Sequence, residues 1–264
     1  MPDHDLRSAG LELDTTKPSP ARVYDYFIGG KDNFAADRAA ADMVLKDWPE
    51  IRPAALANRR FLSRVVAELT RRGFRQFLDL GSGLPTQENV HHVAQRIAPD
   101  ARVVYVDNDP MVLAHARALL DDSSGTRYVH ADLRDVDEVL RAALDTGLID
   151  YDEPLVLLMV AVLPFFRETD DARGIITRYT GALAPGSLFV CSGMVSNTAP
   201  PEAAARIRQQ FGSAPSPALI RTRAQVNEIL DGFEVEPPGL GNVRTWPDPG
   251  PDEFPLNYGG VLRV

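Results

Sequence analysis

The hydrophobic positions of this chain follow two different periods, and the period changes near residue 73. Before that point, over residues 53–72, apolar side chains recur at the spacing of one face of an α-helix. The positions that define this face are Phe61, Leu62, Val65, Val66 and Leu69. They predict an amphipathic helix that ends at Gly73, and shorter helical patterns precede it at residues 21–28 and 35–46.

After residue 73, short apolar runs typical of buried strands alternate with stretches of helical period. The apolar runs fall at residues 77–80, 103–106, 127–130, 155–160 and 188–191. The helical stretches between them cover residues 86–97, 109–120, 135–144 and 171–183. Thr86, Asp109 and Asp135 stand where the first three of these helices begin, and their side-chain oxygens can accept first-turn N–H groups. This alternation predicts an α/β fold with a parallel sheet and right-handed crossovers.

After residue 191, the regular alternation of strand and helix is no longer followed. The pattern indicates helices near residues 201–211 and after Thr222, and two strands at residues 233–235 and 258–264. The expected organisation is a flexible N-terminal arm over residues 1–20 and a single domain over residues 21–264. Within that domain, we expect residues 21–72 to form a helical lid and residues 73–264 to form the core.

Composition and charge exclude several classes of function. The formal net charge of −9 disfavours nucleic acids and anionic membranes as partners, because both need clustered lysine and arginine. Cys191 is the only cysteine, which excludes an intrachain disulfide, and the chain has no Cys/His zinc pattern. The longest apolar run, residues 155–166, is too short to span a membrane. With a polar first stretch and no signal peptide, the chain is expected to be cytoplasmic; the oligomeric state stays open.

The first chemical signal is the sequence DLGSGLPT at residues 79–86. A strand that runs into glycines and then into a helix lets backbone N–H groups approach a ligand closely. A tight turn with no ligand is the alternative interpretation of this motif alone. The dinucleotide fingerprint needs a third glycine, but Thr86 stands in that place after Pro85.

The second strand adds an acidic side chain at the same edge of the expected sheet. Asp107 follows the run 103–106, and a carboxylate at this position can accept hydrogen bonds from both hydroxyls of a ribose. The alternative role is that of a helix cap. Asp109 already suits the cap, so Asp107 is available for a ligand.

These motifs together resemble a bacterial family of largely uncharacterised S-adenosylmethionine-dependent methyltransferases of class I. The similar stretches are ARVYDYFIGGKDNFAADR (21–38), NRRFLSRVV (58–66), QFLDLGSGLPTQENVHHVAQ (76–95), ARVVYVDNDPMVLAHARALL (101–120) and FEVEPPGLGNV (233–243). The resemblance implies a Rossmann-like, mostly parallel sheet of seven strands, with the last strand antiparallel, helices on both faces and an N-terminal helical cover. It also implies S-adenosylmethionine as the cofactor and S-adenosylhomocysteine as the product.

The resemblance further implies where the adenine would bind. An acidic residue after the third strand receives the adenine amino group in this class, and the next backbone amide meets a ring nitrogen. Asp132 and Leu133 match these positions. The alternative is that Asp132 simply begins a loop.

The methionine end of the cofactor needs partners for its carboxylate and its ammonium group. The glycine loop offers backbone groups, and Lys31 or Arg60 could pair with the carboxylate, with Asn33 and Tyr26 adding hydrogen bonds. The alternative for Lys31 and Arg60 is a solvated surface charge. We therefore expect residues 24–34, YDYFIGGKDNF, to form a lid over this end of the cofactor. The complete expected cofactor-binding set is Asp79, Gly81, Ser82, Gly83, Asp107, Asn108, Asp132, Leu133, Ala161, Tyr26, Lys31, Asn33 and Arg60.

The chain departs from the family after its fourth strand. Family members tend to carry a histidine there, but this chain has Ala161 followed by Val162, Leu163 and Pro164, and no Asn-Pro-Pro-Tyr sequence. No catalytic residue is therefore assigned, although His92 and His130 lie near the motifs. Methyl transfer depends mostly on alignment of the acceptor, so a general base is needed only for a protonated acceptor.

The leading hypothesis is a methyltransferase acting on an unidentified small molecule. A non-catalytic S-adenosylmethionine-binding protein is the first alternative, motivated by the unusual loop after residue 160. A nicotinamide-dependent oxidoreductase on the same sheet is the second alternative, and the missing third glycine argues against it.

Overall fold

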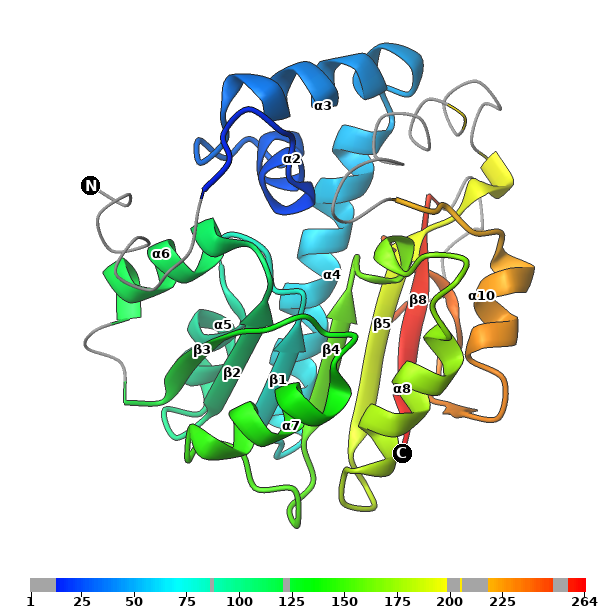
Figure 1. Cartoon of the computed structure of the whole chain (residues 1–264). Coiled ribbons are helices and arrows are strands. Elements are labelled where there is room, and N and C mark those ends of the chain that lie inside the picture. Colours follow the sequence, from blue (N-terminus) through cyan, green and yellow to red (C-terminus); the bar gives the residue numbers. More distant parts are fainter. Residues whose placement is uncertain (1–12, 86–87, 121–123, 199–204, 206–217, 249–255) are drawn as a thin grey trace.

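The computed structural model describes residues 13–85, 88–120, 124–198, 205, 218–248 and 256–264. A central sheet lies between two layers of helices, and a further group of N-terminal helices crosses one end of it (Figure 1). The strands of the described part are β1 Gln76–Leu80, β2 Arg102–Asp107, β3 Thr126–His130, β4 Val156–Val160, β5 Leu188–Met194, β6 Glu234–Val235, β7 Gly241–Asn242 and β8 Asn257–Arg263. The α-helices there are α2 Pro20–Phe27, α3 Ala35–Asp47, α4 Ile51–Arg71, α5 Val90–Ile97, α6 Pro110–Leu120, α7 Val136–Asp145, α8 Ala172–Gly181 and α10 Arg223–Ile229.

The sheet is parallel through most of its width and reverses its chain order at β1. The strands are arranged β3-β2-β1-β4-β5-β8-β6, and β7 pairs with β8. β1 is parallel to both β2 and β4, whereas β8 is antiparallel to β5 and to β6. In open α/β sheets, ligands bind outside the carboxyl ends of the strands at the point where the order reverses. That point here is the junction of β1, β2 and β4.

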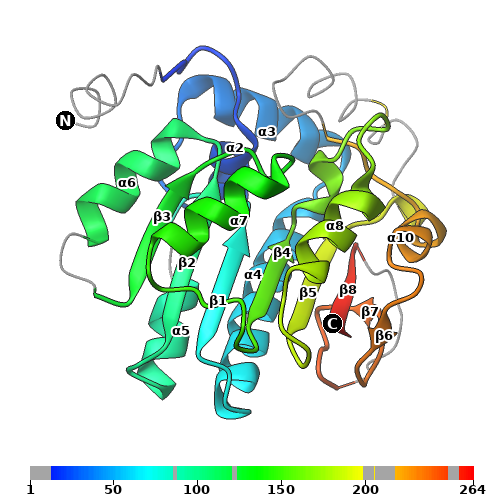
Figure 2. The same cartoon turned by 60° about the horizontal axis from the view of Figure 1, so that its bottom comes forward.

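Side chains of β1 alternate between two hydrophobic cores. Leu78 and Leu80 pack with the helices α7 and α8, whereas Phe77 packs with α4 and α5 on the opposite face. Figure 2 shows α7 and α8 on one side of the sheet and α4 on the other. Because alternate residues of a strand face opposite ways, Asp79 lies on the same face as Phe77, toward α4.

The expected α/β fold is confirmed, and the helix and strand predictions hold with small shifts. One correction concerns the helix predicted from residue 86, because α5 begins at Val90 after Asn89. Thr86, its proposed cap, and all but residue 205 of the helix predicted near 201–211 lie outside the described residues. The described part has eight strands rather than seven, since the two-residue strands β6 and β7 both pair with β8.

The N-terminal helices lie over the carboxyl end of the sheet. Figure 1 shows α2 and α3 across the ends of the central strands, with α4 running down from them along one face. Residues 1–12 of the predicted arm lie outside the described residues, and the division into arm, lid and core stays a prediction. In the part of the chain that the structure describes, no helix is both long enough and apolar enough to cross a membrane.

Asp25 organises the stretch YDYFIGGKDNF. Its side chain is buried, and one carboxylate oxygen accepts the backbone N–H of Asp32 at 2.9 Å and the amide of Asn33 at 2.8 Å. Gly29 has a φ of 85°, which turns the chain back toward Asp25. A Cβ on Gly30 would overlap the Asp25 carboxylate. The paired glycines therefore allow the loop to close tightly on a buried carboxylate.

We expect Gly30→Ala to lower the free energy of unfolding by about 1–3 kcal/mol, because the added methyl group displaces a buried, hydrogen-bonded carboxylate. Urea unfolding followed by circular dichroism measures this loss. Gly181→Ala is the matched control, since a Cβ at that helical glycine meets no atom within 4 Å. Equal stability of the two variants would contradict this role of Gly30.

Candidate functional site

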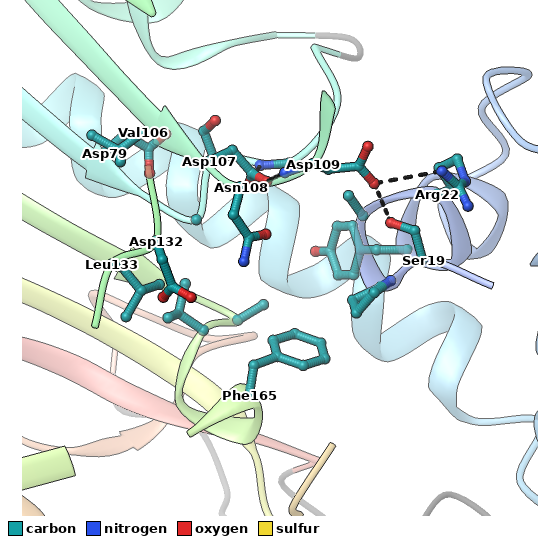
Figure 3. Close-up of a pocket in the computed structure, with 18 of the residues that line it drawn as sticks. Ser19, Arg22, Asp79, Val106, Asp107, Asn108, Asp109, Asp132, Leu133 and Phe165 are labelled. Carbon is teal, nitrogen blue, oxygen red and sulfur yellow. Dashed lines mark hydrogen bonds and ion pairs between the residues drawn. The ribbon is translucent and has the colours of Figure 1, made fainter. Parts of the chain in front are cut away.

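A cavity of about 430 Å³ opens at the carboxyl ends of the central strands. Its walls come from the ends of β1, β2 and β4, the loop after β3, the helix α4 and the N-terminal segment 13–22 (Figure 3). The cavity therefore occupies the reversal point of the sheet, where the fold alone predicts a ligand site.

The glycine loop, residues 81–83, follows the carboxyl end of β1 and forms part of the cavity wall. Gly81 and Gly83 have φ values of 70° and 66°, a backbone conformation that favours glycine. The N–H groups of Gly81 and Ser82 both donate to the carbonyl of Val106, at 2.8 and 3.2 Å. A Cβ on Gly81 would lie 2.7 Å from a methyl group of Val162. The loop is thus folded back onto β2, and at Gly81 there is no room for a side chain.

Asp107 is held in place with capacity for further hydrogen bonds. One carboxylate oxygen accepts from Gly83 N–H at 2.8 Å, and the other accepts from Asp109 N–H at 2.9 Å. A carboxylate has about four lone-pair sites, so Asp107 can still accept a hydrogen bond from a ligand. Burial raises the pKa of Asp107 to about 6, although these backbone hydrogen bonds oppose the increase.

Asp79 is a second carboxylate in the lining and is more deeply buried. Its residue is 4% exposed, and burial raises its pKa to about 7. The positive charge of Arg59 on α4 opposes this increase, and the negative charge of Asp107 adds to it. Arg59 also donates to Glu88 O and to Asn89 Oδ1, at 3.3 and 3.0 Å. Arg59 therefore connects α4 to the residues just before α5, and its charge acts on Asp79.

The loop after β3 contributes Asp132, Leu133 and Arg134 to the cavity lining. The backbone N–H of Arg134 donates to Asp132 Oδ1 at 3.0 Å, and the hydroxyl of Tyr179 donates to Leu133 O at 2.7 Å. The side chains of Asn108, Asp132 and Phe165 point into the same space (Figure 3). This end of the cavity combines polar groups with an aromatic wall.

Arg22 attaches the N-terminal segment to the rest of the site. Its guanidinium contacts Asp37 at 3.0 Å and Asp109 at 3.7 Å, and it donates to the carbonyls of Asp14 and Lys17 at 3.1 and 2.7 Å. The side chains of Arg22, Asp37 and Asp109 are at most 8% exposed. The hydroxyl of Ser19 also bonds to Asp109 (Figure 3). This network holds segment 13–19 as one wall of the cavity.

The loop after β4 forms the opposite wall. Ala161 has a φ of 65°, a strained conformation for a residue with a side chain, and its N–H donates to Ser192 O at 2.9 Å. The buried Arg221 donates to the carbonyls of Leu163 and Phe166, at 2.6 and 2.8 Å. These bonds hold Phe165 toward the cavity (Figure 3).

Most of the residues predicted for the site meet in this cavity. The predicted residues that line it are Asp79, Gly81, Ser82, Gly83, Asp107, Asn108, Asp132, Leu133 and Ala161. They come from separate parts of the sequence, and the carboxyl ends of four strands bring them together. Their roles in binding remain predictions.

The other predicted residues, Tyr26, Lys31, Asn33 and Arg60, are not among the residues that line the cavity, and the lid over the cofactor stays a prediction. Tyr26 donates instead to Asp42 at 2.9 Å, and Asn33 donates to Asp25. Lys31 and Arg60 are exposed outside the lining. Successive helical residues differ by about 100° in direction. The neighbouring residues Tyr24 on α2 and Arg59 on α4 line the cavity in their place.

The role of Arg22 was not predicted, although the sequence places it and a possible acidic partner on either side of the aromatic stretch. An arginine at position 22 and an aspartate at position 37 flank the aromatic stretch in a segment that matches the family, but their pairing depends on a helix packing that the sequence does not specify. Neither His92 nor His130 is among the residues that line the cavity. Across the described ranges, His, Cys, Asp and Glu side chains form no group of three or more that could bind a metal ion.

Comparisons with known proteins show which family the chain resembles. Residues 7–259 match the model of the S-adenosyl methyltransferase family. A crystal structure of a methyltransferase candidate from Thermobifida fusca YX is 40% identical, with a TM-score of 0.86, and the match covers 95% of this chain and 96% of that one. A DUF574 family protein from Streptomyces avermitilis MA-4680 is 38% identical, with a TM-score of 0.87 and coverage of 96% and 99%. A comparison with curated proteins finds no match.

The chain belongs to the S-adenosyl methyltransferase family, because the family model spans nearly its whole length. It is an S-adenosylmethionine-dependent methyltransferase, and S-adenosylmethionine is its cofactor. This confirms the predicted family, fold, activity and cofactor.

We expect Asp79→Asn to stabilise the ligand-free protein, and to do so more strongly at high pH. The pKa of Asp79 is about 7 in the folded protein and 3.8 as its ordinary value, so the folded state binds the extra proton between these values. Wild-type stability therefore falls as pH rises from about 4 to about 7, and the variant lacks this contribution. Urea unfolding should show the advantage of the variant growing by on the order of 2 kcal/mol between about pH 5.5 and about pH 8. An advantage independent of pH would contradict this electrostatic account.

Proposed function

We propose that this methyltransferase binds S-adenosylmethionine in the cavity at the ends of β1, β2 and β4, and methylates a small organic acceptor. The observation that carries the proposal is the position of Asp107, which lines the cavity beside the glycine loop and is held by the N–H groups of Gly83 and Asp109, one on each carboxylate oxygen. Two adjacent acceptor oxygens suit the two hydroxyls of a ribose.

The chemistry of the lining fits the whole cofactor. Asp132 and the N–H of Leu133 offer an acceptor beside a donor, as the edge of adenine requires. Ser82 Oγ is buried and has no hydrogen-bond partner among the described residues, so it is available to a ligand group. The buried carboxylate of Asp79 suits the ammonium group of the cofactor, because its negative charge is otherwise costly at this depth.

Arg59 replaces Lys31 and Arg60 as the proposed partner of the cofactor carboxylate. It lines the cavity together with Tyr24 and Asp79, and its charge acts on Asp79. A guanidinium there would contact a carboxylate through charge-assisted hydrogen bonds. Its bonds to Glu88 O and Asn89 fix the side chain in place before any ligand binds.

The bound cofactor supplies a methyl group on a sulfonium, which is already a good leaving group. The remaining task of the protein is to orient the acceptor and to exclude water. Tyr24 and Phe165 suit this task because both are aromatic residues that line the cavity. The hydroxyl of Tyr24 points away to Ala55 O at 3.1 Å, so its ring rather than its hydroxyl faces the ligand.

A small-molecule acceptor suits a cavity of this size, with walls on several sides. The acidic net charge of −9 supports the same choice, since a nucleic-acid acceptor would need a basic surface. We further propose a bacterial and cytoplasmic setting, supported by the sources of the two related structures and by the buried free thiol of Cys191.

We expect S-adenosylhomocysteine to bind the wild-type protein, and Arg59→Met to weaken that binding by about tenfold or more, because a charge-assisted contact is lost. The variant should bind 5′-methylthioadenosine with nearly unchanged affinity, since this compound lacks the amino-acid end. Asp107→Asn should weaken the binding of both compounds, because both carry the ribose. Isothermal titration calorimetry measures each affinity.

Arg60→Met is the matched control, since Arg60 is exposed on the same helix outside the cavity lining. Its affinities should equal those of the wild type. An equal loss for both compounds in Arg59→Met would show that Arg59 acts on the glycine loop and not on the carboxylate. Failure of the wild type to bind S-adenosylhomocysteine at millimolar concentration would refute the proposed site.

A further inference from the structure

Arg134 lines the cavity and binds the carboxylate of Asp132 through several hydrogen bonds. Its backbone N–H donates to Oδ1 at 3.0 Å, and Nε donates to Oδ1 at 2.8 Å and to Oδ2 at 3.1 Å. Nη2 donates to Oδ2 as well. Arg134 also lies 3.9 Å from Asp170, which follows the loop after β4. The guanidinium is thus oriented from two sides, and it fixes the plane of the Asp132 carboxylate.

The bonds from Arg134 leave part of the Asp132 carboxylate, and the neighbouring N–H of Leu133, available to a ligand. Three N–H groups of Arg134 bind the carboxylate of Asp132, and that of Nε is shared between Oδ1 and Oδ2. A carboxylate has about four lone-pair sites, so capacity for one further donor remains. Beside it, no acceptor in the described part of the chain receives the N–H of Leu133. Both groups line the cavity. The pair therefore presents one acceptor and one donor, side by side.

The charged surroundings keep Asp132 an acceptor. Burial raises its pKa, but the hydrogen bonds and charge of Arg134, with the charge of Arg167, outweigh burial and lower the pKa overall. Asp170 lies near the same guanidinium, and the hydroxyl of Tyr179, whose own pKa is raised mainly by burial, is neutral and lies near Asp132 and Asp135. An ionised carboxylate can accept hydrogen bonds but cannot donate one.

We propose that Arg134 is a positioning residue that makes this site select a 6-aminopurine over a 6-oxopurine. The inference rests on the proposed placement of the adenine against Asp132 and Leu133. Adenine offers a 6-amino donor beside the N1 acceptor, which complements the pair. Hypoxanthine offers a 6-oxo acceptor beside an N1–H donor, so both of its groups oppose those of the protein. Without Arg134, the carboxylate is free to rotate, or to take a proton and donate to the 6-oxo group.

The test compares S-adenosylhomocysteine with S-inosylhomocysteine, which differ only in this purine edge. Titration calorimetry on the full-length protein gives both dissociation constants and their ratio. We expect the wild type to favour the adenosyl compound by about 100-fold or more, because a mismatched site leaves buried polar groups unpaired. Arg134→Met should reduce that ratio by about tenfold or more. Arg134→Lys should retain an intermediate ratio, since lysine keeps the charge but not the forked geometry.

Arg141→Met is the matched control, because Arg141 is exposed on α7 and pairs with Asp145 away from the cavity. Its ratio should equal that of the wild type. Loss of affinity for both compounds in Arg134→Met at an unchanged ratio would overturn the proposal, since that is the result of a purely structural role. A wild type that binds both compounds equally would also overturn it, while leaving the proposed cofactor site intact. Arg134→Gln provides a second neutral variant should the methionine variant fail to fold.

Discussion

The buried guanidinium of Arg22 determines how this site is enclosed. It faces the carboxylates of Asp37 and Asp109 and the carbonyls of two residues in segment 13–19. Charges at this depth are tolerated only when they are paired, and removal of one partner leaves the others uncompensated. The arginine therefore joins three pieces of chain that are distant in sequence: the N-terminal segment, α3 and the start of α6. As a result, the ligand cavity has a wall where the edge of an open sheet would otherwise face solvent.

The carboxylates inside that enclosure illustrate a conflict between stability and function. Burial raises the pKa values of Asp79 and Asp107, which means that their ionised forms are costly in the ligand-free protein. The pKa of Asp132 is instead lowered, because the hydrogen bonds and charge of Arg134 outweigh the effect of burial. A ligand with hydroxyl and ammonium donors would relieve the cost at the first two positions. The same arrangement of strand ends that makes ionisation of these carboxylates costly would therefore favour the binding of such a ligand.

The sequence was sufficient for features that depend on periodicity and on the ends of strands. Apolar runs located β1 to β5, and the rule that parallel strands end at one edge brought Gly81, Asp107 and Asp132 together. Side chains on the polar N-terminal helices could not be assigned in the same way. A shift of one or two residues separates Tyr24 and Arg59, which line the cavity, from Tyr26 and Arg60, which do not. The rotation of these helices is set by tertiary pairs such as Arg22 with Asp37, and no local pattern specifies it.

The central claim is that the cofactor lies in the cavity between Arg59 and Asp132, beneath the N-terminal segment. A crystal structure with S-adenosylhomocysteine bound tests it most directly. The account predicts the ribose hydroxyls on Asp107, the adenine edge against Asp132 and Leu133, the homocysteine carboxylate near Arg59, and the Arg22 network intact. Density for the ligand elsewhere, or with the adenine and homocysteine ends reversed, would contradict it.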